Sequence, residues 1–124
     1  MARVLVVDDE SQMRELLCQA LEGRGHTVDQ AADGREALRR FAQQQPDLVI
    51  TDLVMPEMEG IETIQALRRK CPAIPIIAIS GGGRVEPENY LAIAGQIGAD
   101  RTFAKPFRLE EILTAVQELT TKAT

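Results

Sequence analysis

Short apolar runs rich in β-branched residues alternate with amphipathic stretches along this chain. Three of the runs, VLVV, LVI and IPIIAI, are continuous, which is typical of parallel strands buried on both faces. The second and the fifth run carry more polar residues, which favours edge positions in the sheet. The pattern predicts strands at Arg3–Val7, Thr27–Ala31, Asp47–Thr51, Ile74–Ser80 and Arg101–Ala104.

The stretches between these runs have the spacing of helices that pack one face on a core. In the first stretch, apolar residues recur at i, i+3, i+4, i+7 and i+8 from Met13, and Ser11 is a candidate N-cap. Gly23 and Gly25 indicate where this helix ends. A similar stripe lies near the C-terminus, and a short helix is expected within Glu86–Gln96.

Strict alternation of strands and helices predicts an α/β fold, in which helices cover both faces of a five-stranded parallel sheet. The 124 residues fit one compact domain and are too few for two ordinary ones. In doubly wound sheets of this kind, functional sites form at the carboxyl ends of the strands. The residues at those ends are therefore the first candidates for a site.

Polar side chains stand at the carboxyl ends of four predicted strands: Asp8 and Asp9 after the first, Asp52 after the third, Ser80 on the fourth and Lys105 after the fifth. Any one of them alone is usually a turn residue, a helix cap or solvated surface. Five residues with complementary chemistry at one edge of a sheet rarely arise from turn formation alone. The sequence therefore predicts that these side chains converge on one site.

Three carboxylates in a small site repel one another unless a cation or a proton neutralises them. Ligands that are all oxygen favour a hard cation, and Mg²⁺ suits a site that leaves positions to water or phosphate. Beside such a metal, the carboxylate of Asp52 can attack a phosphoryl donor and form an acyl phosphate. Lys105 and Ser80 can then compensate charge on the phosphoryl oxygens. The residues alone therefore predict that Asp52 accepts a phosphoryl group.

Three motifs in order, VLVVDDE, ITDLVMPEMEG and FAKPF, resemble those of response regulator receiver domains in two-component signalling. The similarity runs from Arg3 to Leu119, and it implies one receiver domain over residues 1–124. It also implies a flavodoxin-like, doubly wound (βα)5 fold with strand order 2-1-3-4-5. A histidine kinase or a histidine phosphotransfer protein is then expected as the phosphoryl donor, and a downstream protein effector as the receiver of the signal.

The resemblance also assigns roles to individual positions. The ligands that it implies for Mg²⁺ are Asp8, Asp9, Asp52 and the backbone carbonyl of Val54. It makes Asp52 the phosphoacceptor, Ser80 the hydroxyl that senses the phosphate and Lys105 the site lysine, which a cis peptide joins to Pro106. A domain of this type assists its own phosphorylation and dephosphorylation, but we do not expect it to be an enzyme.

One position departs from the family pattern. Receiver domains usually carry Tyr or Phe three residues before the lysine, where this chain has Thr102. Phe103 follows it, and strand alternation predicts that its ring points to the opposite face of the sheet. The stretch from Ser80 to Lys105 is also long and begins with Gly81–Gly83. We hypothesise that this loop rearranges on phosphorylation in place of the ring.

Composition narrows the partners and the compartment. With 14 Lys and Arg against 19 Asp and Glu, the net charge of -5 argues against direct nucleic acid binding. No apolar stretch approaches the length of a membrane span. Cys18 and Cys71 lack the spacing of zinc ligands and suit a reducing cytoplasm as free thiols. His26 and the basic run Arg68–Lys70 are interpreted as solvated surface.

Two other classes of protein remain open from the residues alone. A hydrolase of the haloacid-dehalogenase type also forms an aspartyl phosphate with Mg²⁺, but it usually has a second aspartate where this chain has Val54. A flavin-binding flavodoxin-like protein needs a phosphate-binding loop after the first strand, where Asp8, Asp9 and Glu10 would repel phosphate. No effector region follows Thr124, so we expect that the protein acts through protein contacts or is a piece of a longer one.

Overall fold

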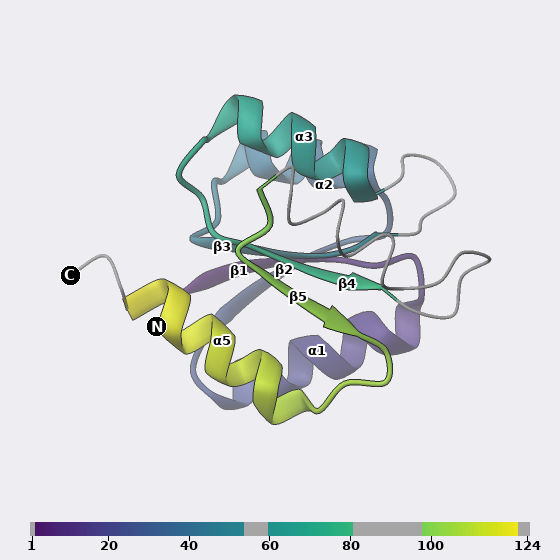
Figure 1. The fold of residues 1–124 in the computed structure, drawn as a ribbon, viewed down its shortest axis with the longest axis vertical. Helices are drawn as coiled ribbons and strands as arrows, with labels where there is room; N and C mark the ends of the chain where they lie inside the picture. The colour runs from purple at the N-terminus through teal and green to yellow at the C-terminus, as the bar shows by residue number, and fades with distance from the viewer. Residues whose placement is uncertain (1, 54–59, 81–97, 122–124) are drawn as a thin grey trace.

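The computed structural model describes residues 2–53, 60–80 and 98–121 (Figure 1). Its elements, in chain order, are β1 (Arg3–Val7), α1 (Ser11–Gly23), β2 (Thr27–Ala31), α2 (Gly34–Gln43), β3 (Leu48–Asp52), α3 (Gly60–Lys70), β4 (Ile76–Ser80), β5 (Arg101–Ala104) and α5 (Leu109–Thr121). The expected short helix, the glycine loop and Val54 lie outside the described residues. Within the described ranges, no helix is long and apolar enough to cross a membrane.

The strand boundaries agree closely with the prediction, with two differences. β3 begins one residue later than predicted and ends at Asp52, so the candidate nucleophile is itself part of the strand. β4 begins at Ile76 and not at Ile74. The N–H of Ile74 bonds back to the carbonyl of Cys71 in a turn, and Pro75 has no N–H to donate to a neighbouring strand.

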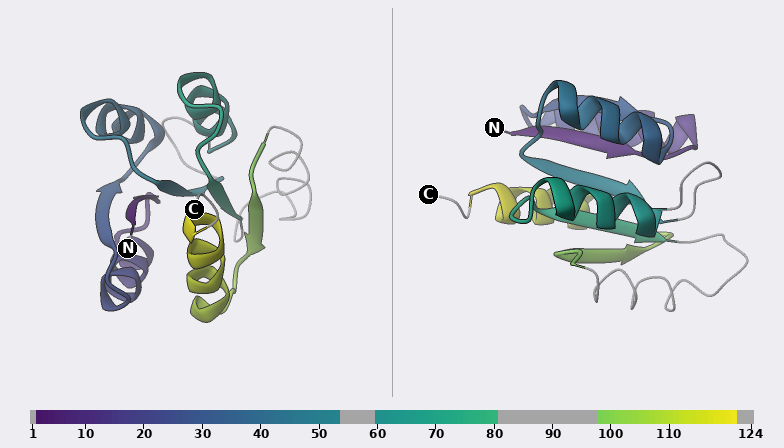
Figure 2. Two further views of the ribbon diagram at one scale, coloured as in Figure 1. Left: turned by 90° about the vertical axis from the view of Figure 1, so that its left-hand side faces the viewer. Right: turned by 90° about the horizontal axis from the view of Figure 1, so that it is seen from above.

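All strand pairs are parallel and follow the order β2-β1-β3-β4-β5, as predicted, with β2 and β5 at the edges. Helices α1 and α5 cover one face of the sheet, and α2 and α3 cover the other (Figures 1 and 2). Because side chains alternate along a strand, Val4 and Val6 join the core under α1 and α5, whereas Leu5 and Val7 join the core under α2 and α3. Packing on both faces of the sheet therefore fixes where the carboxyl ends of the central strands lie.

The start of α1 differs from the prediction. Ser11 is the first residue of the helix and not its N-cap, a position that Glu10 occupies without a side-chain cap bond. The carboxylate of Asp8 accepts the Glu10 N–H at 2.9 Å instead, so the chain turns into the helix one residue early. The helix ends at Gly23 as predicted, and Gly25 adopts a left-handed φ of 90° just beyond it.

Candidate functional site

Three carboxylates meet at the carboxyl edge of the sheet. One carboxylate oxygen from each of Asp8, Asp9 and Asp52 lies within 4.8 Å of the other two. Asp8 and Asp9 follow β1, and Asp52 ends β3, which pairs with β1 in parallel. Asp8 and Asp52 are only 2% and 5% exposed, whereas Asp9 is exposed. The structure thus brings together the carboxylates that the strand ends predict.

Asp8 carries the clearest electrostatic signature of this crowding. Burial raises its pKa from 3.8 to about 6, and the negative charges of Asp52 and Asp9 act in the same direction. The hydrogen bond from the Glu10 N–H and the nearby charge of Lys105 oppose this rise in pKa only in part. A hard cation between the three carboxylates would remove the repulsion, and their all-oxygen donor set fits Mg²⁺.

Lys105 supplies a positive charge at the same edge. Its Nζ lies 3.4 Å from Oδ2 of Asp52, 3.7 Å from Oδ2 of Asp8 and 3.6 Å from Oε1 of Glu10. Burial opposes the charge of the ammonium, but these three carboxylates outweigh it, so the pKa of Lys105 lies above its ordinary value. The peptide bond between Lys105 and Pro106 is cis, as the family resemblance implies.

Ser80 ends β4 beside this cluster and is 1% exposed. In the parallel register of the sheet, Asp52 pairs with Ile79, the residue before Ser80. The carbonyl of Ser80 accepts the Lys105 N–H at 2.7 Å, and this bond joins the end of β4 to the residue that follows β5. All five candidate residues therefore lie at one edge of the sheet.

Two further residues belong to this edge that the sequence reasoning did not assign to the site. Glu10 contacts Lys105 through its exposed carboxylate, as described above. Arg14, on the first turn of α1, donates from Nη1 to the carbonyl of Asp8 at 2.7 Å and from Nε to Oε1 of Gln30 at 3.1 Å. Glu10 could have been assigned to this edge from the sequence, because it directly follows the aspartate pair. The sequence signal for Arg14 was weaker, namely its position in the first turn of the helix that follows this pair.

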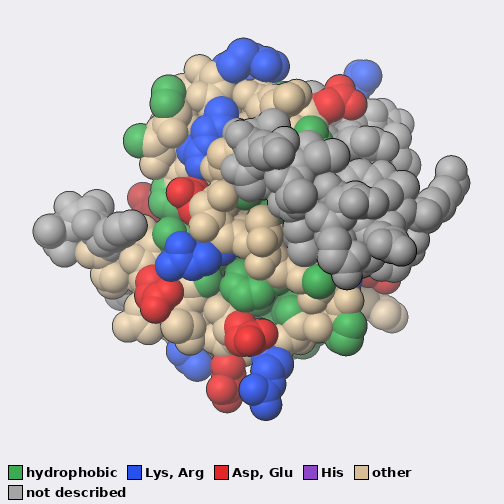
Figure 3. All heavy atoms as spheres, in the orientation of Figure 1, with side chains coloured by type: hydrophobic (Ala, Val, Ile, Leu, Met, Phe, Trp, Pro, Cys, Tyr) green, Lys and Arg blue, Asp and Glu red, His purple; other side chains and the backbone are tan. Residues whose placement is uncertain are grey.

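The face beside β5 shows how the chain departs from its family pattern. Phe103 packs against the core under α1 and α5, whereas Thr102 is exposed, so the ring lies on the predicted face. A groove of about 440 Å³ lies between β5 and α5, lined by Arg101, Thr102, Phe103, Glu110, Glu111, Thr114, Ala115 and Glu118. Figure 3 shows hydrophobic side chains on this side of the molecule with acidic and basic ones around them.

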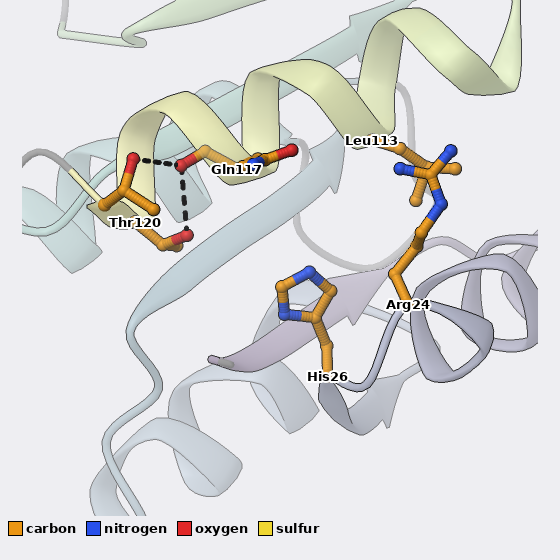
Figure 4. A pocket seen from close by; sticks show the side chains of 6 residues that line it. Arg24, His26, Leu113, Gln117 and Thr120 are labelled. Carbon is orange, nitrogen blue, oxygen red and sulfur yellow. Dashed lines mark hydrogen bonds between the residues drawn. The ribbon is translucent and has the colours of Figure 1, made fainter.

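His26 directly precedes β2, so it lies at the amino-terminal end of the strands, opposite to the acidic cluster. Figure 4 shows His26 beside Arg24. It borders a pocket of about 230 Å³, whose other lining residues are Arg24, Leu113, Gln117, Thr120 and Thr121. Its Nδ1 accepts the Ala2 N–H at 3.1 Å, and partial burial lowers the pKa of the imidazole. The residue is therefore half-buried and not fully solvated, and it is no part of the site at the carboxyl edge.

A parallel sheet in this strand order, with acidic residues and one lysine at its carboxyl edge, defines the class of receiver modules in two-component signalling. The family model of the response regulator receiver domain matches residues 4–117. The response regulator MprA of Mycolicibacterium vanbaalenii is 38% identical over 123 residues, which are 98% of this chain and 52% of that protein. MprA of Mycobacterium ulcerans is 38% identical over 118 residues, which are 94% of this chain and 49% of that protein. The chain thus spans about half the length of these relatives.

Solved structures agree with this assignment. A response regulator receiver domain protein from Clostridium thermocellum has a TM-score of 0.90 and 27% identity, over 99% of this chain and 97% of that one. The receiver domain of NtrX from Brucella abortus has a TM-score of 0.87 and 27% identity, over 95% of this chain and 98% of that one. The chain belongs to the response regulator receiver domain family, and it is a phosphoacceptor signalling domain.

Proposed function

We propose that Asp52 is the residue that accepts the phosphoryl group. The observation that carries this assignment is the buried carboxylate of Asp52, which lies within 4.8 Å of carboxylate oxygens of Asp8 and Asp9 and 3.4 Å from Nζ of Lys105. In the transfer, an oxygen of Asp52 forms a bond to phosphorus while the bond from phosphorus to the donor's histidine nitrogen breaks. The proposed donor is a histidine kinase or a histidine phosphotransfer protein, whose imidazole takes up a proton as it leaves.

The residues around Asp52 would compensate the negative charge of the carboxylates and of the phosphoryl oxygens. Asp8, Asp9 and Asp52 would hold Mg²⁺, together with the backbone carbonyl of Val54 that the family resemblance implies. The bound ion would supply positive charge at the phosphoryl oxygens. Lys105 would turn from Asp52 to a phosphoryl oxygen, and the hydroxyl of Ser80 would donate a hydrogen bond to another.

The proposal extends to the whole chain as one receiver domain over residues 1–124 that assists its own phosphorylation and dephosphorylation but turns over no other substrate. Phosphorylation would change a surface that a downstream protein effector binds. The family match favours this role over the hydrolase and flavin-binding alternatives. The proposed compartment is the cytoplasm, where free thiols such as those of Cys18 and Cys71 stay reduced.

Beryllofluoride, a mimic of the phosphoryl group, tests the site without the chemistry. With Mg²⁺ present, we expect a fluorine NMR signal of bound beryllofluoride in the unchanged protein and none in Asp52→Asn. Asp33→Asn is the matched control, because Asp33 caps α2 after the outer strand β2, outside the cluster of Asp8, Asp9 and Asp52, and Asn caps a helix equally well. Binding that survives Asp52→Asn would refute the assignment.

A further inference from the structure

The guanidinium of Arg68, in the last turn of α3, is held at the amino-terminal ends of the strands, opposite to the acidic site. Its Nε donates to the carbonyl of Gly98 at 3.2 Å, and its Nη2 donates to Oδ2 of Asp100 at 2.9 Å. Its Nη1 donates to the carbonyl of Pro72 at 3.0 Å and also to that of Ile74. These acceptors come from the turn between α3 and β4 and from the segment that leads into β5, which approaches α3 in Figure 1.

These contacts correct the interpretation of the basic run 68–70 as solvated surface. The side chain of Arg68 is only 19% exposed, although Arg69 and Lys70 are exposed as expected. The approach of Arg68 also explains a glycine. Gly98 has a φ of +115°, which strains any other residue, and a Cβ on it would lie 2.9 Å from Nε of Arg68, so the side chain of Arg68 would have to move.

Asp100 connects this contact to the sheet. Its Oδ2 accepts the Ile76 N–H at 2.8 Å, and its own N–H donates to the Ile76 carbonyl at 2.8 Å. The first residue of β4 is therefore bound through both of its backbone groups, directly before β5 begins at Arg101. We refer to Arg68, Gly98 and Asp100 together as the β5 clasp.

Within the described part of the chain, the strand that the β5 clasp holds pairs with one neighbour, β4, and has little side-chain packing on the core. β5 is a four-residue strand at the sheet edge, and of its side chains Phe103 alone packs against the core while the others are exposed. A slip of one residue would move its end by about 3.3 Å and turn its side chains to the opposite face. That shift is as large as the 3.4 Å between Nζ of Lys105, which follows β5, and Oδ2 of Asp52.

We propose that Arg68 is a positioning residue for phosphoryl transfer at Asp52. The β5 clasp sets the register of β5 on β4, and this register places Lys105 beside Asp52. Arg68 itself lies at the opposite end of the strand and touches no reacting atom. The inference rests on the proposed function, in which Lys105 acts at Asp52.

The test compares Arg68→Gln with Arg69→Gln, a matched control on the same helix. The first readout is the rate at which acetyl phosphate with Mg²⁺ labels Asp52, measured below the melting temperature of each variant. The second is the hydrogen exchange of the Lys105 amide, which donates to the Ser80 carbonyl at 2.7 Å. We expect Arg68→Gln to slow labelling about tenfold and to lower the protection of this amide. Arg69→Gln changes neither.

A double variant separates positioning from a general loss of stability. If Arg68 acts through Lys105, adding Arg68→Gln to Lys105→Ala lowers the labelling rate by less than about twofold. An equal loss in both backgrounds, or unchanged protection of the Lys105 amide in Arg68→Gln, would overturn the proposal.

Two further variants, Asp100→Asn and Lys105→Ala, separate a failure of this inference from a failure of the proposed function. Should Arg68→Gln fail to fold, Asp100→Asn keeps an oxygen for the Ile76 N–H but weakens the pairing with Arg68. We then expect the labelling rate to fall by less than about tenfold. An unchanged labelling rate in Asp100→Asn would contradict the proposal. If Lys105→Ala labels at the unchanged rate, the proposed role of Lys105 fails and this inference fails with it. Normal labelling of Arg68→Gln, with slow labelling of Lys105→Ala, rejects the role of Arg68 alone.

Discussion

The ammonium of Lys105 lies 3.4 Å from Oδ2 of Asp52, although the two residues are 53 positions apart in the chain. The contact joins the residue after the edge strand β5 to the last residue of the central strand β3. The same Nζ lies 3.7 Å from Oδ2 of Asp8, so one cation faces two buried carboxylates. The opposing charges at this edge are arranged before any phosphoryl group arrives.

Removal of that cation should slow phosphorylation. In Lys105→Ala, we expect labelling of Asp52 by acetyl phosphate to slow by at least about tenfold, because charge on the phosphoryl oxygens loses a fixed donor. Initial rates measured by intact-protein mass spectrometry check this. Lys70→Ala, which removes an exposed lysine at the end of α3, is the control and should label at the unchanged rate.

The raised pKa of Asp8 predicts how pH and Mg²⁺ act together on stability. Between its ordinary value of 3.8 and about 6, the native state binds more protons at Asp8 than the unfolded chain does. The contribution of Asp8 to stability therefore falls as pH rises through this window. Mg²⁺ binds the ionised carboxylate, so we expect it to raise the melting temperature more at pH 7 than at pH 5.

Asp8→Asn isolates the contribution of this residue to the pH profile. Other groups titrate in the same range, so the informative quantity is the difference in melting temperature between the unchanged protein and this variant. We expect the metal-free variant to gain stability over the unchanged protein as pH rises from 5 to 7, and to lose most of the response to Mg²⁺. A Mg²⁺ response of equal size at both pH values would contradict the assignment of Asp8 as a ligand.

Two neighbouring leucines on α1 test the arrangement of the core. Leu17 is 1% exposed and packs under the sheet, whereas Leu16 is 44% exposed. We expect Leu17→Ala to lower the free energy of unfolding by about 2–5 kcal/mol, because it leaves a cavity in the core. Leu16→Ala should change it by about 0.5 kcal/mol or less. Urea denaturation measures both, and equal effects would show that α1 faces the sheet differently.

Two glycines test the close approach of Arg68 to the segment before β5. Gly98→Ala should lower the free energy of unfolding by about 1–3 kcal/mol, since it places a side chain on a left-handed backbone against the guanidinium of Arg68. Gly23→Ala is the control, because a Cβ there meets nothing within 4 Å. Its effect on the free energy of unfolding should stay within about 0.5 kcal/mol.

The gathering of Asp8, Asp9, Asp52 and Lys105 could be predicted from the sequence for a physical reason. Continuous apolar runs indicate parallel strands, and parallel strands bring their carboxyl ends to one edge. Any polar residue directly after such a run must then lie at that edge. The face on which Phe103 packs followed from strand alternation in the same way.

Other contacts could not be predicted, because they depend on distances in space that the pattern of apolar and polar residues does not specify. The hold of Arg68 on Gly98 and Asp100 spans about thirty positions, and its acceptors are mainly backbone carbonyls, which no residue type signals. The N-cap prediction at Ser11 failed because the carboxylate of Asp8 takes the N–H of Glu10, an arrangement set by the site and not by helix propensity.

Direct mapping of the modified residue tests the central claim. The protein is treated with acetyl phosphate and Mg²⁺, reduced with borohydride to trap the acyl phosphate as homoserine, digested and sequenced by tandem mass spectrometry. We predict that the trapped residue is the one at position 52 and that Asp52→Asn yields none. A trapped residue elsewhere in the chain, or no modification under varied donors, would contradict the account.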